Sequence, residues 1–221
     1  MIKVIEFSDV SKSFKNKYRV LSNTSFECMS GNTYFLYGQS CAGKTTIFKL
    51  LLKDIEPNSG TIKICGDDLA QFNQKQLLLY RQQLGIIWQD LFLLEQKTVF
   101  ENIALPLTLR AEKKDIISKK VNQLLEESDL LSEKDNFVRN LTLGQKQIVA
   151  ILRAIITNPR LILADEPMNH IDTSKEKVMW DLINRHKDPN AVILFTTSQK
   201  YIIDNFQGNL LDMQNGNVVI K

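Results

Sequence analysis

The sequence contains no apolar run of membrane-spanning length. Its most apolar stretch, residues 148–156, is interrupted by Arg153 and is shorter than the roughly 20 residues that a membrane-spanning helix needs. The first seven residues alternate like a β-strand and lack the apolar centre of a signal peptide. We therefore expect the protein to be cytoplasmic, with any membrane association coming through a partner.

Cysteine and net charge are also scarce. The three cysteines, Cys28, Cys41 and Cys65, are odd in number and show no regular spacing, so reduced thiols are expected. A net charge of +3 is too small to indicate a nucleic-acid partner. The remaining composition, 43% hydrophobic and 24% charged in 221 residues, is typical of one globular domain with a sizeable core.

Residues 38–46, GQSCAGKTT, fit the phosphate-binding pattern G-x-x-x-x-G-K-[ST]. An aromatic and β-branched segment, 33–37, precedes them and predicts a buried strand, while 47–52 can start a helix. A strand, a tight turn and a helix N-terminus direct backbone N–H groups at one point, where the macrodipole also favours an anion. The pattern therefore predicts an ATP site with Lys44 on the terminal phosphates and the Thr45 hydroxyl on Mg²⁺. The predicted binding residues are Gly38, Gln39, Ser40, Cys41, Ala42, Gly43, Lys44, Thr45 and Thr46.

A pair of carboxylates, Asp165 and Glu166, directly follows the apolar segment 161–164, which is predicted to be a buried strand. Ligands of open parallel sheets bind beyond the carboxyl ends of the strands. Asp165 can complete the Mg²⁺ shell that Thr45 begins. Glu166 can take or orient the proton of an attacking water. The pair is therefore predicted to supply the chemistry of the site.

Strands that alternate with helices predict an α/β fold, a mostly parallel sheet core with an antiparallel β region. Three successive helical patterns in 98–140 predict an inserted α-helical lobe, in which Pro106 is expected to end the helix that begins at Val99. Expected strands are 2–7, 19–27, 33–37, 61–65, 84–88, 161–164, 192–195 and a hairpin within 208–220; a polar loop is expected at 15–17. We expect a core formed by 1–90 and 158–221, with the lobe at about 91–157.

Two helix starts carry the signature of a capping box, in which a hydroxyl residue is followed three positions later by Glu or Gln. Thr142 and Gln145 form one such pair, and Thr173 and Glu176 form the other. Both are expected to mark the first turn of a helix.

These motifs, in this order, resemble the ATP-binding cassette of ABC transporters over the whole chain. The resemblance implies that two cassettes, here a homodimer, close head to tail around two ATP molecules, each between one chain's P-loop and the other's signature segment. It makes Phe14 an adenine-stacking residue, whereas the residues alone leave a plain core position open. It further implies that Glu166, Lys44 and Thr197 are catalytic, that Thr45, Gln89 and Asp165 hold the metal, and that Gln89, Thr142, Gly144, Gln145 and Asp172 contact the nucleotide.

Within that family the segments 80–90, 98–107 and 136–137 are most similar to the FtsE type, near the LolD and MacB types. This likeness implies a cell-division role with an FtsX-like integral membrane partner, and a peripheral position on the inner face of the membrane. A partner helix is expected beside Gln89, with Trp88, Leu91, Phe92 and Leu93 either anchoring it or lying in the core. Alternatives are the energising ATPase of a lipoprotein, macrolide or peptide exporter, and an ATP-gated clamp with negligible turnover.

The chain departs from the family pattern at three positions. Cys41 replaces a P-loop glycine, and Leu143 replaces the first glycine of the signature Leu-Ser-Gly-Gly-Gln. Thr197 aligns with the switch histidine, and neither His170 nor His186 lies where it could substitute. The loss of one preorganised electrostatic contact typically lowers the rate by roughly a hundredfold. The sequence therefore supports ATP binding more strongly than fast hydrolysis.

Overall fold

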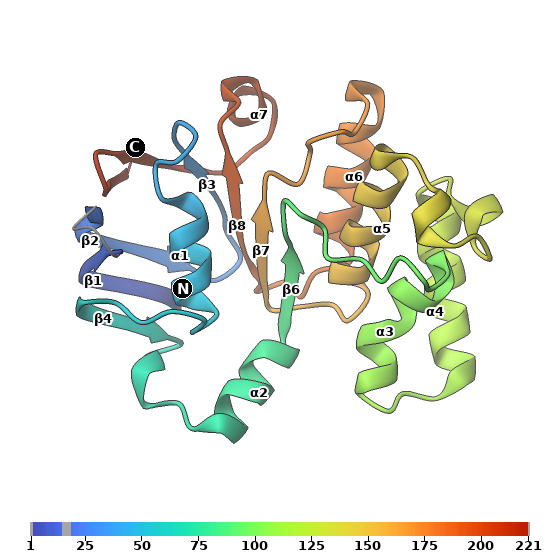
Figure 1. Cartoon of the computed structure of the whole chain (residues 1–221), viewed down its shortest axis with the longest axis horizontal. Helices are drawn as coiled ribbons and strands as arrows, with labels where there is room; N and C mark the ends of the chain where they lie inside the picture. Colours follow the sequence, from blue (N-terminus) through green and yellow to red (C-terminus); the bar gives the residue numbers. More distant parts are fainter. Residues whose placement is uncertain (1, 15–18, 221) are drawn as a thin grey trace. The chain divides into compact units, whose positions relative to one another are not determined.

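The computed structural model describes residues 2–14 and 19–220, and the chain divides into two compact units. The first unit comprises Met1–Gln82 and Pro189–Lys221, and the second comprises Gln83–Asp188 (Figure 1). The polar loop expected at 15–17 lies outside the described residues. The predicted helical lobe falls within the second unit, which also contains two strands.

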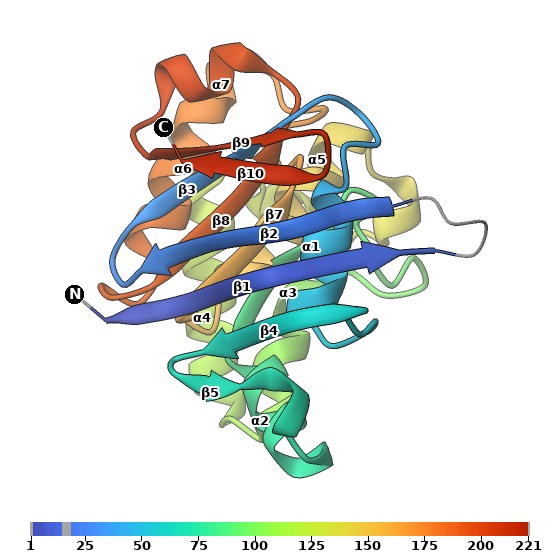
Figure 2. The same cartoon turned by 90° about the vertical axis from the view of Figure 1, so that its left-hand side faces the viewer.

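An antiparallel sheet forms one part of the first unit (Figure 2). Its strands are β1 (Lys3–Ser13), β2 (Arg19–Met29), β4 (Ser59–Ile64) and β5 (Asp67–Asp68), in the order β2-β1-β4-β5. Strand β1 is longer than the predicted 2–7 because it stays paired with β2 as far as Ser13, through several register shifts. Asp9 in this irregular stretch has a φ of 50°, as a bulged residue often does.

Parallel strands form the other sheet of the first unit. Strand β3 (Thr33–Tyr37) lies between β8 (Val192–Thr197) and β9 (Asn209–Gln214) and is parallel to both. Strand β10 (Asn217–Ile220) closes an antiparallel hairpin with β9. Asn215 and Gly216 at its tip have φ angles of 49° and 76°, so the hairpin predicted there is confirmed.

In its described residues the first unit also forms three α-helices, α1 (Lys44–Leu51), α2 (Gln74–Gln82) and the short α7 (Lys200–Asn205), and a 3-10 turn at Leu69–Gln71. Helix α7 was not among the predicted elements. Helix α1 buries Ile47, Phe48, Leu50 and Leu51 almost completely. A helix that is apolar on so much of its surface is fixed by packing rather than by helix propensity. Its first residue, Lys44, is thereby held at a defined place.

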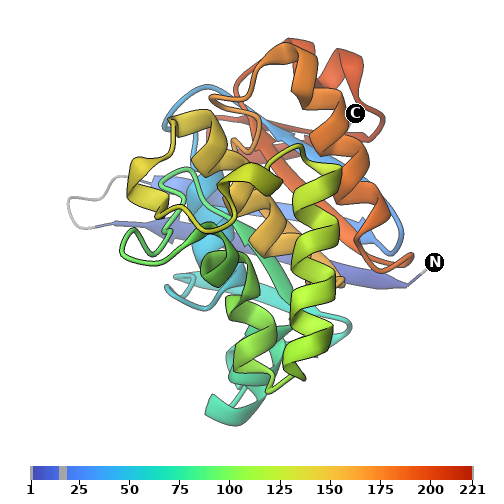
Figure 3. The same cartoon turned by 90° about the vertical axis from the view of Figure 1, so that its right-hand side faces the viewer.

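The second unit combines two parallel strands with four helices. Strand β6 (Leu84–Ile87) pairs with β7 (Leu161–Asp165), and the helices are α3 (Val99–Leu109), α4 (Lys114–Glu127), α5 (Leu143–Ile155) and α6 (Thr173–Arg185). Helices α3 and α4 lie side by side, as seen from the right-hand side of the molecule (Figure 3). Short 3-10 turns occur at Leu131–Glu133 and Val138–Asn140. Among the described residues, no helix combines the length and apolarity that membrane crossing requires.

Two local predictions about helices are wrong. Helix α3 continues through Pro106 to Leu109; a proline inside a helix removes one hydrogen bond, but the buried residues Ile103, Ala104 and Leu107 pack on either side of it. The N-cap of α6 is Asp172, not Thr173, so the second predicted capping box is not formed. By contrast, Thr142 and Gln145 form the predicted capping box at the start of α5.

Candidate nucleotide-binding site

The P-loop lies between the end of β3 at Tyr37 and the start of α1 at Lys44, as predicted. Gln39, Ser40 and Cys41 are exposed at its tip. Cys41 has a φ of 64°, in the left-handed region that favours glycine, which gives a physical reason for the glycine usual at this position. The cysteine therefore keeps the conformation of the loop at the expense of some backbone strain.

Gly43 is the N-cap of α1, with a φ of 106°. A Cβ atom on Gly43 would lie 2.6 Å from Val20 Cγ1 and 2.8 Å from Met213 Cε. Side chains from β2 and β9 thus pack against Gly43, and any larger residue would require the Val20 and Met213 side chains to move. The glycine is required both by conformation and by space.

Lys44 is almost fully buried, and its ammonium group is turned back onto the loop. Lys44 Nζ donates hydrogen bonds to the carbonyl oxygens of Gly38, at 2.7 Å, and of Gln39, at 3.2 Å. The charge therefore lies against the carbonyl groups at the start of the loop, and Lys44 is itself the first residue of α1. Phosphate oxygens that bind at the loop can replace the two carbonyl groups as stronger, charged acceptors.

A cavity of about 700 Å³ adjoins the P-loop. This volume lies within the range of roughly 300–1,000 Å³ typical of small-molecule sites. Beyond the predicted Gly38–Ala42, its lining includes Arg19, Val20, Tyr37 and the C-terminal residues Asp212, Met213, Gln214, Asn215 and Gly216. The sequence carries no motif for the residues from β2 and the hairpin; only the folded unit brings them to the loop.

Phe14 follows β1, and 43% of its surface is exposed, which contradicts the alternative that it is a core residue. Lys12 Nζ lies 5.5 Å from the centroid of its ring. A ring that is exposed beside a cation can stack on a base, but the stacking role stays a prediction.

Thr197 is the last residue of β8 and is only 1% exposed. Its hydroxyl oxygen accepts a hydrogen bond from the backbone N–H of Gln199 at 3.0 Å, so the side chain closes its own turn. The next residue, Ser198, is the first exposed side chain after the strand. The structure therefore presents Ser198 more readily than Thr197 to a ligand, and the switch role of Thr197 remains a prediction.

The predicted carboxylates lie in the second unit. Asp165 is the last residue of β7 and is 2% exposed. Glu166 follows it with a φ of 48°, and its carbonyl oxygen accepts a hydrogen bond from Asn169 N at 3.1 Å. This turn ends at Asp172, the exposed N-cap of α6. The two carboxylates thus differ in environment: one is buried in the sheet, and the other is half-buried at the turn.

The signature segment forms the start of α5. Thr142 accepts a hydrogen bond from Gln145 N at 3.3 Å, and Gln145 Oε1 accepts one from Thr142 N at 2.9 Å. Both side chains therefore cap the helix. A Cβ atom on Gly144 would lie 2.7 Å from the carbonyl oxygen of His170, so this glycine is needed for packing within the unit. Leu143, in contrast, is 50% exposed.

The proposed metal ligands combine the Thr45 hydroxyl, the Gln89 amide and the Asp165 carboxylate, with Thr45 in the first unit and the others in the second. An oxygen donor set with one carboxylate suits Mg²⁺ that is held largely by substrate phosphates. Within the described ranges, no group of three or more His, Cys, Asp or Glu residues could hold a metal by itself. The donor chemistry fits, and metal binding at these residues stays a prediction.

The four apolar residues expected near Gln89 have different environments. Leu91 is buried, at 7% exposure, so it belongs to the core. Phe92 is 63% exposed and lies with its ring centroid 6.2 Å from that of Trp88. Phe92 is therefore the strongest candidate for an anchor in this set.

Comparison with known proteins places the chain in a large group. The family profile described as "ABC transporter" matches residues 21–169. The cell division ATP-binding protein FtsE of Streptococcus pneumoniae serotype 2 is 30% identical over 216 residues, covering 98% of this chain and 94% of the relative. The methionine import ATP-binding protein MetN of Clostridioides difficile is 35% identical over 217 residues, covering 98% of this chain and 67% of the relative.

The fold is shared with a solved ATP-binding cassette, a dimer in a post-hydrolysis state bound to ADP and Pi. That structure has a TM-score of 0.89 at 22% identity and covers 98% of this chain and 97% of its own. The predicted fold class, a cassette with mixed sheets and helices, is thereby confirmed.

Proposed function

The chain belongs to the ABC transporter family, and from this premise we propose that it is the ATP-binding, slowly hydrolysing subunit of an FtsE/FtsX-like cell-division membrane complex. The observation that supports ATP binding most strongly is the buried Lys44 ammonium group, 2.7 Å from the Gly38 carbonyl oxygen. It lies in a glycine-bearing loop beside a cavity of about 700 Å³. The lining of this cavity includes Gly38 to Ala42 but not Lys44, so the loop borders the space while Lys44 supplies the charge on the loop's own carbonyl groups.

The individual residues have separate tasks in this proposal. Lys44 exchanges its carbonyl acceptors for the terminal phosphates and offsets their charge. Thr45, Gln89 and Asp165 would hold Mg²⁺, and the ion would supply further positive charge to stabilise the phosphate groups. Glu166 orients an attacking water and accepts its proton.

The signature segment acts on the ATP of a second copy in the proposed homodimer. Because the side chains of Thr142 and Gln145 cap α5, this segment offers the nucleotide mainly backbone N–H groups and the positive end of the helix. Asp172 and Phe14 complete the proposed contacts, on the evidence of the family resemblance.

Slow hydrolysis follows from two side chains. Leu143, which replaces a glycine of the family pattern, is half exposed. The Thr197 hydroxyl already accepts a hydrogen bond from Gln199 N. If the switch position, Thr197, does not supply the electrostatic contact that a histidine makes there, the rate of hydrolysis falls by roughly a hundredfold. These same two features favour a second candidate function, an ATP-gated clamp in which nucleotide-driven dimerisation, not turnover, is the signal.

The membrane partner is inferred from the relatives named FtsE, and it would hold the chain on the inner face of the membrane. Two features support an apolar helix as the occupant: the exposed Phe92, and a cavity of about 490 Å³ on α3 and α4. The lining of this cavity includes the apolar Leu94, Phe100, Ala104, Leu105 and Ile117 and the charged Lys97, Glu101, Glu112 and Lys114. The MetN relative keeps a transport complex as the alternative setting for the same chemistry.

The proposal is tested with Glu166→Gln in the purified chain. Phosphate release should fall by at least about a hundredfold, and an ATP-dependent dimer should persist in light scattering. Glu126→Gln, an exposed carboxylate on α4, is the matched control and should leave both unchanged. A Glu166→Gln variant that releases phosphate at the parental rate would exclude the enzyme function. Absence of turnover in both proteins, with an ATP-dependent dimer, would favour the clamp.

A further inference from the structure

Two successive residues in the loop after β6 have left-handed backbone conformations. The φ angles are 59° for Leu91 and 44° for Phe92, and neither residue is glycine. Each such conformation is unfavourable for an L-residue and persists only where its surroundings hold it in place. This turn therefore needs a partner in the fold that stabilises it.

That partner is Arg153, in the last turn of α5. Its two terminal nitrogens donate hydrogen bonds to the carbonyl oxygens of Leu91, at 2.7 Å, and of Phe92, at 2.8 Å. Burial lowers the pKa of Arg153 from its ordinary value, but a guanidinium group remains charged in proteins. A planar fork with two parallel donors matches two adjacent carbonyl groups, a geometry that lysine cannot reproduce.

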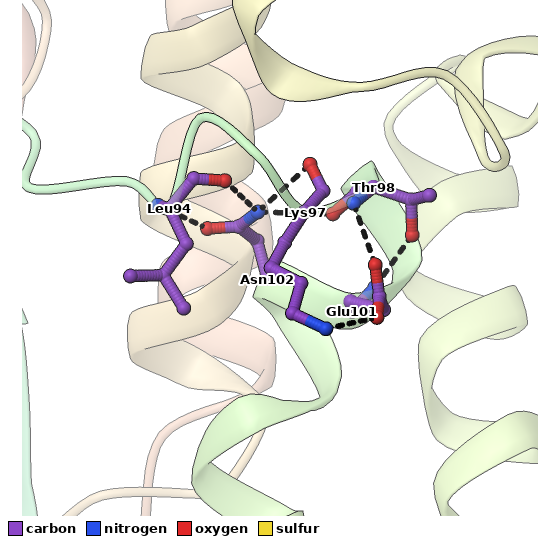
Figure 4. Close-up of polar contacts among 5 residues, drawn as sticks. All are labelled: Leu94, Lys97, Thr98, Glu101 and Asn102. Carbon is purple, nitrogen blue, oxygen red and sulfur yellow. Dashed lines mark hydrogen bonds and ion pairs between the residues drawn. The ribbon is translucent and has the colours of Figure 1, made fainter.

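The rest of the loop is held by Asn102, which is completely buried and whose side-chain amide makes hydrogen bonds with this segment (Figure 4). Asn102 Oδ1 accepts a hydrogen bond from Leu94 N at 2.8 Å, and Nδ2 donates to the carbonyl oxygens of Leu94, at 3.0 Å, and Thr98, at 2.9 Å. Lys97 and Glu101 form an ion pair at 2.8 Å, and the Glu101 carboxylate also accepts a hydrogen bond from Thr98 N at 2.9 Å. Residues 94–98 thus have side-chain support of their own. The strained turn has two backbone hydrogen bonds, from Leu91 N to Trp88 O at 3.0 Å and from Phe92 N to Asp90 O at 2.7 Å, and Arg153 adds two from a side chain.

The clamped turn separates its two apolar side chains. Leu91 points into the core, at 7% exposure, while Phe92 is 63% exposed beside the Trp88 ring. A large aromatic ring held outside the core on a rigid backbone has the character of an interface anchor, because little conformational freedom is lost when a partner covers it.

At its N-terminal end, helix α5 also contacts the turn that follows Asp165 and Glu166. Gly144 packs so closely on the His170 carbonyl that an added Cβ would approach it to 2.7 Å. One continuous helix, Leu143–Ile155, therefore touches the turn after Glu166 at its start and the Leu91–Phe92 turn at its end. A displacement of α5 would therefore move the Arg153 guanidinium relative to its acceptors, the Leu91 and Phe92 carbonyl oxygens.

We propose that Arg153 is a positioning residue that holds the Leu91–Phe92 turn in its left-handed form and so presents Phe92 to a helix of the membrane partner. Because Arg153 lies on α5, it also links the Leu91–Phe92 turn, through this helix, to the segment that carries Glu166. The link to a membrane partner rests on the proposed function. The hydrogen bonds from Arg153 to the Leu91–Phe92 turn are a property of this chain alone.

The positioning role of Arg153 is tested by hydrogen–deuterium exchange of residues 88–98 in the purified chain without nucleotide. Arg153→Gln should speed exchange in this segment by at least about tenfold, because two charge-assisted hydrogen bonds are lost. Arg153→Lys should restore it only in part. Arg160→Gln, which removes a guanidinium with a 75% exposed side chain, is the control and should leave the segment unchanged. Equal exchange in Arg153→Gln and the parent would overturn the proposal.

Backbone strain is tested separately with Phe92→Gly, since glycine adopts this conformation without penalty. In the Phe92→Gly background, Arg153→Gln should speed exchange by clearly less than it does in the parent. An undiminished effect would mean that Arg153 only packs, and would overturn the positioning role. If Arg153→Gln does not fold, Arg153→Lys carries the same comparison. Because no nucleotide or partner is present, these results are independent of whether the chain hydrolyses ATP.

Discussion

The P-loop and the signature segment both depart from the family pattern, but with different consequences. At the P-loop, Cys41 adopts the left-handed φ of 64° that a glycine would have, and its side chain is exposed. At the signature, Leu143 adds a half-exposed side chain at the first residue of α5. The first change leaves the backbone N–H groups in place; the second adds bulk where a ligand is expected.

From this difference we infer that a site built from backbone groups tolerates substitution better than one built from side chains. A phosphate cradle needs N–H groups and one cation, and these survive a change of side chain. A site that depends on the absence of a side chain, or on one particular side chain, does not. This contrast predicts that the chain keeps nucleotide binding while losing rate.

The largest expected effect on stability is at the glycine that the signature retains. Gly144→Ala should lower the free energy of unfolding by about 1–3 kcal/mol, because its Cβ would meet the His170 carbonyl at 2.7 Å. Helix propensity alone would raise stability by roughly 1 kcal/mol, so urea unfolding distinguishes the two by sign. Leu143→Ala, one residue earlier and 50% exposed, should change stability little. A stabilised Gly144→Ala protein would show that the close packing is not real.

A smaller effect is expected at the departure in the P-loop. Cys41→Gly should raise the free energy of unfolding by less than about 1 kcal/mol, since relief of the strain at φ 64° is partly offset by the greater freedom of glycine in the unfolded chain. Nucleotide affinity, measured by calorimetry, should change by no more than about twofold, which is within 0.5 kcal/mol. A large gain in affinity would show that the Cys41 side chain obstructs the phosphate, against the tolerance argued for this loop.

The smallest effect is expected at a carboxylate outside both segments. Burial alone would raise the pKa of Glu127, but the hydrogen bond from Gln123 and the interactions with His186 and Arg185 bring it below its ordinary value. A carboxylate with a lowered folded pKa contributes stability that is present above the unfolded pKa and is lost as the pH falls through the folded one.

Glu127→Gln should therefore lower the free energy of unfolding at pH 7 and flatten its fall on the acid side, below the ordinary pKa of 4.5. Urea unfolding at pH 7 and at acid pH measures both changes. Nucleotide binding at pH 7 should not change. An acid-side slope equal to that of the parent protein would show that this cluster does not contribute.

Local signals in the sequence predicted the parts of the site that lie within one stretch of chain. The P-loop, the capping box at Thr142 and the hairpin at Asn215 were predicted because each depends on residues a few positions apart. Features that depend on tertiary contacts could not be predicted: the approach of Val20 and Met213 to Gly43, and that of His170 to Gly144. The prediction that the helix ends at Pro106 was wrong because the packing of α3 outweighs the one hydrogen bond that proline removes.

The turn of Thr197 shows the same limit. Alignment with the family pattern places Thr197 at the switch position, and this role stays a prediction. What the sequence could not predict is that the Thr197 hydroxyl accepts a hydrogen bond from Gln199 N and that Ser198 is exposed. A buried hydroxyl that bonds its own turn is common at strand ends. Only the geometry of the strand end distinguishes the two residues.

The central claim is that the Lys44 ammonium group and the P-loop amides together hold a triphosphate. Calorimetric titration with ATP and magnesium tests it most directly, with Lys44→Ala compared against Lys49→Ala, an exposed lysine on the same helix. We predict that Lys44→Ala weakens binding by at least about a hundredfold, equivalent to about 2.7 kcal/mol, and that Lys49→Ala binds like the parent. Equal affinity of Lys44→Ala and the parent would contradict the account.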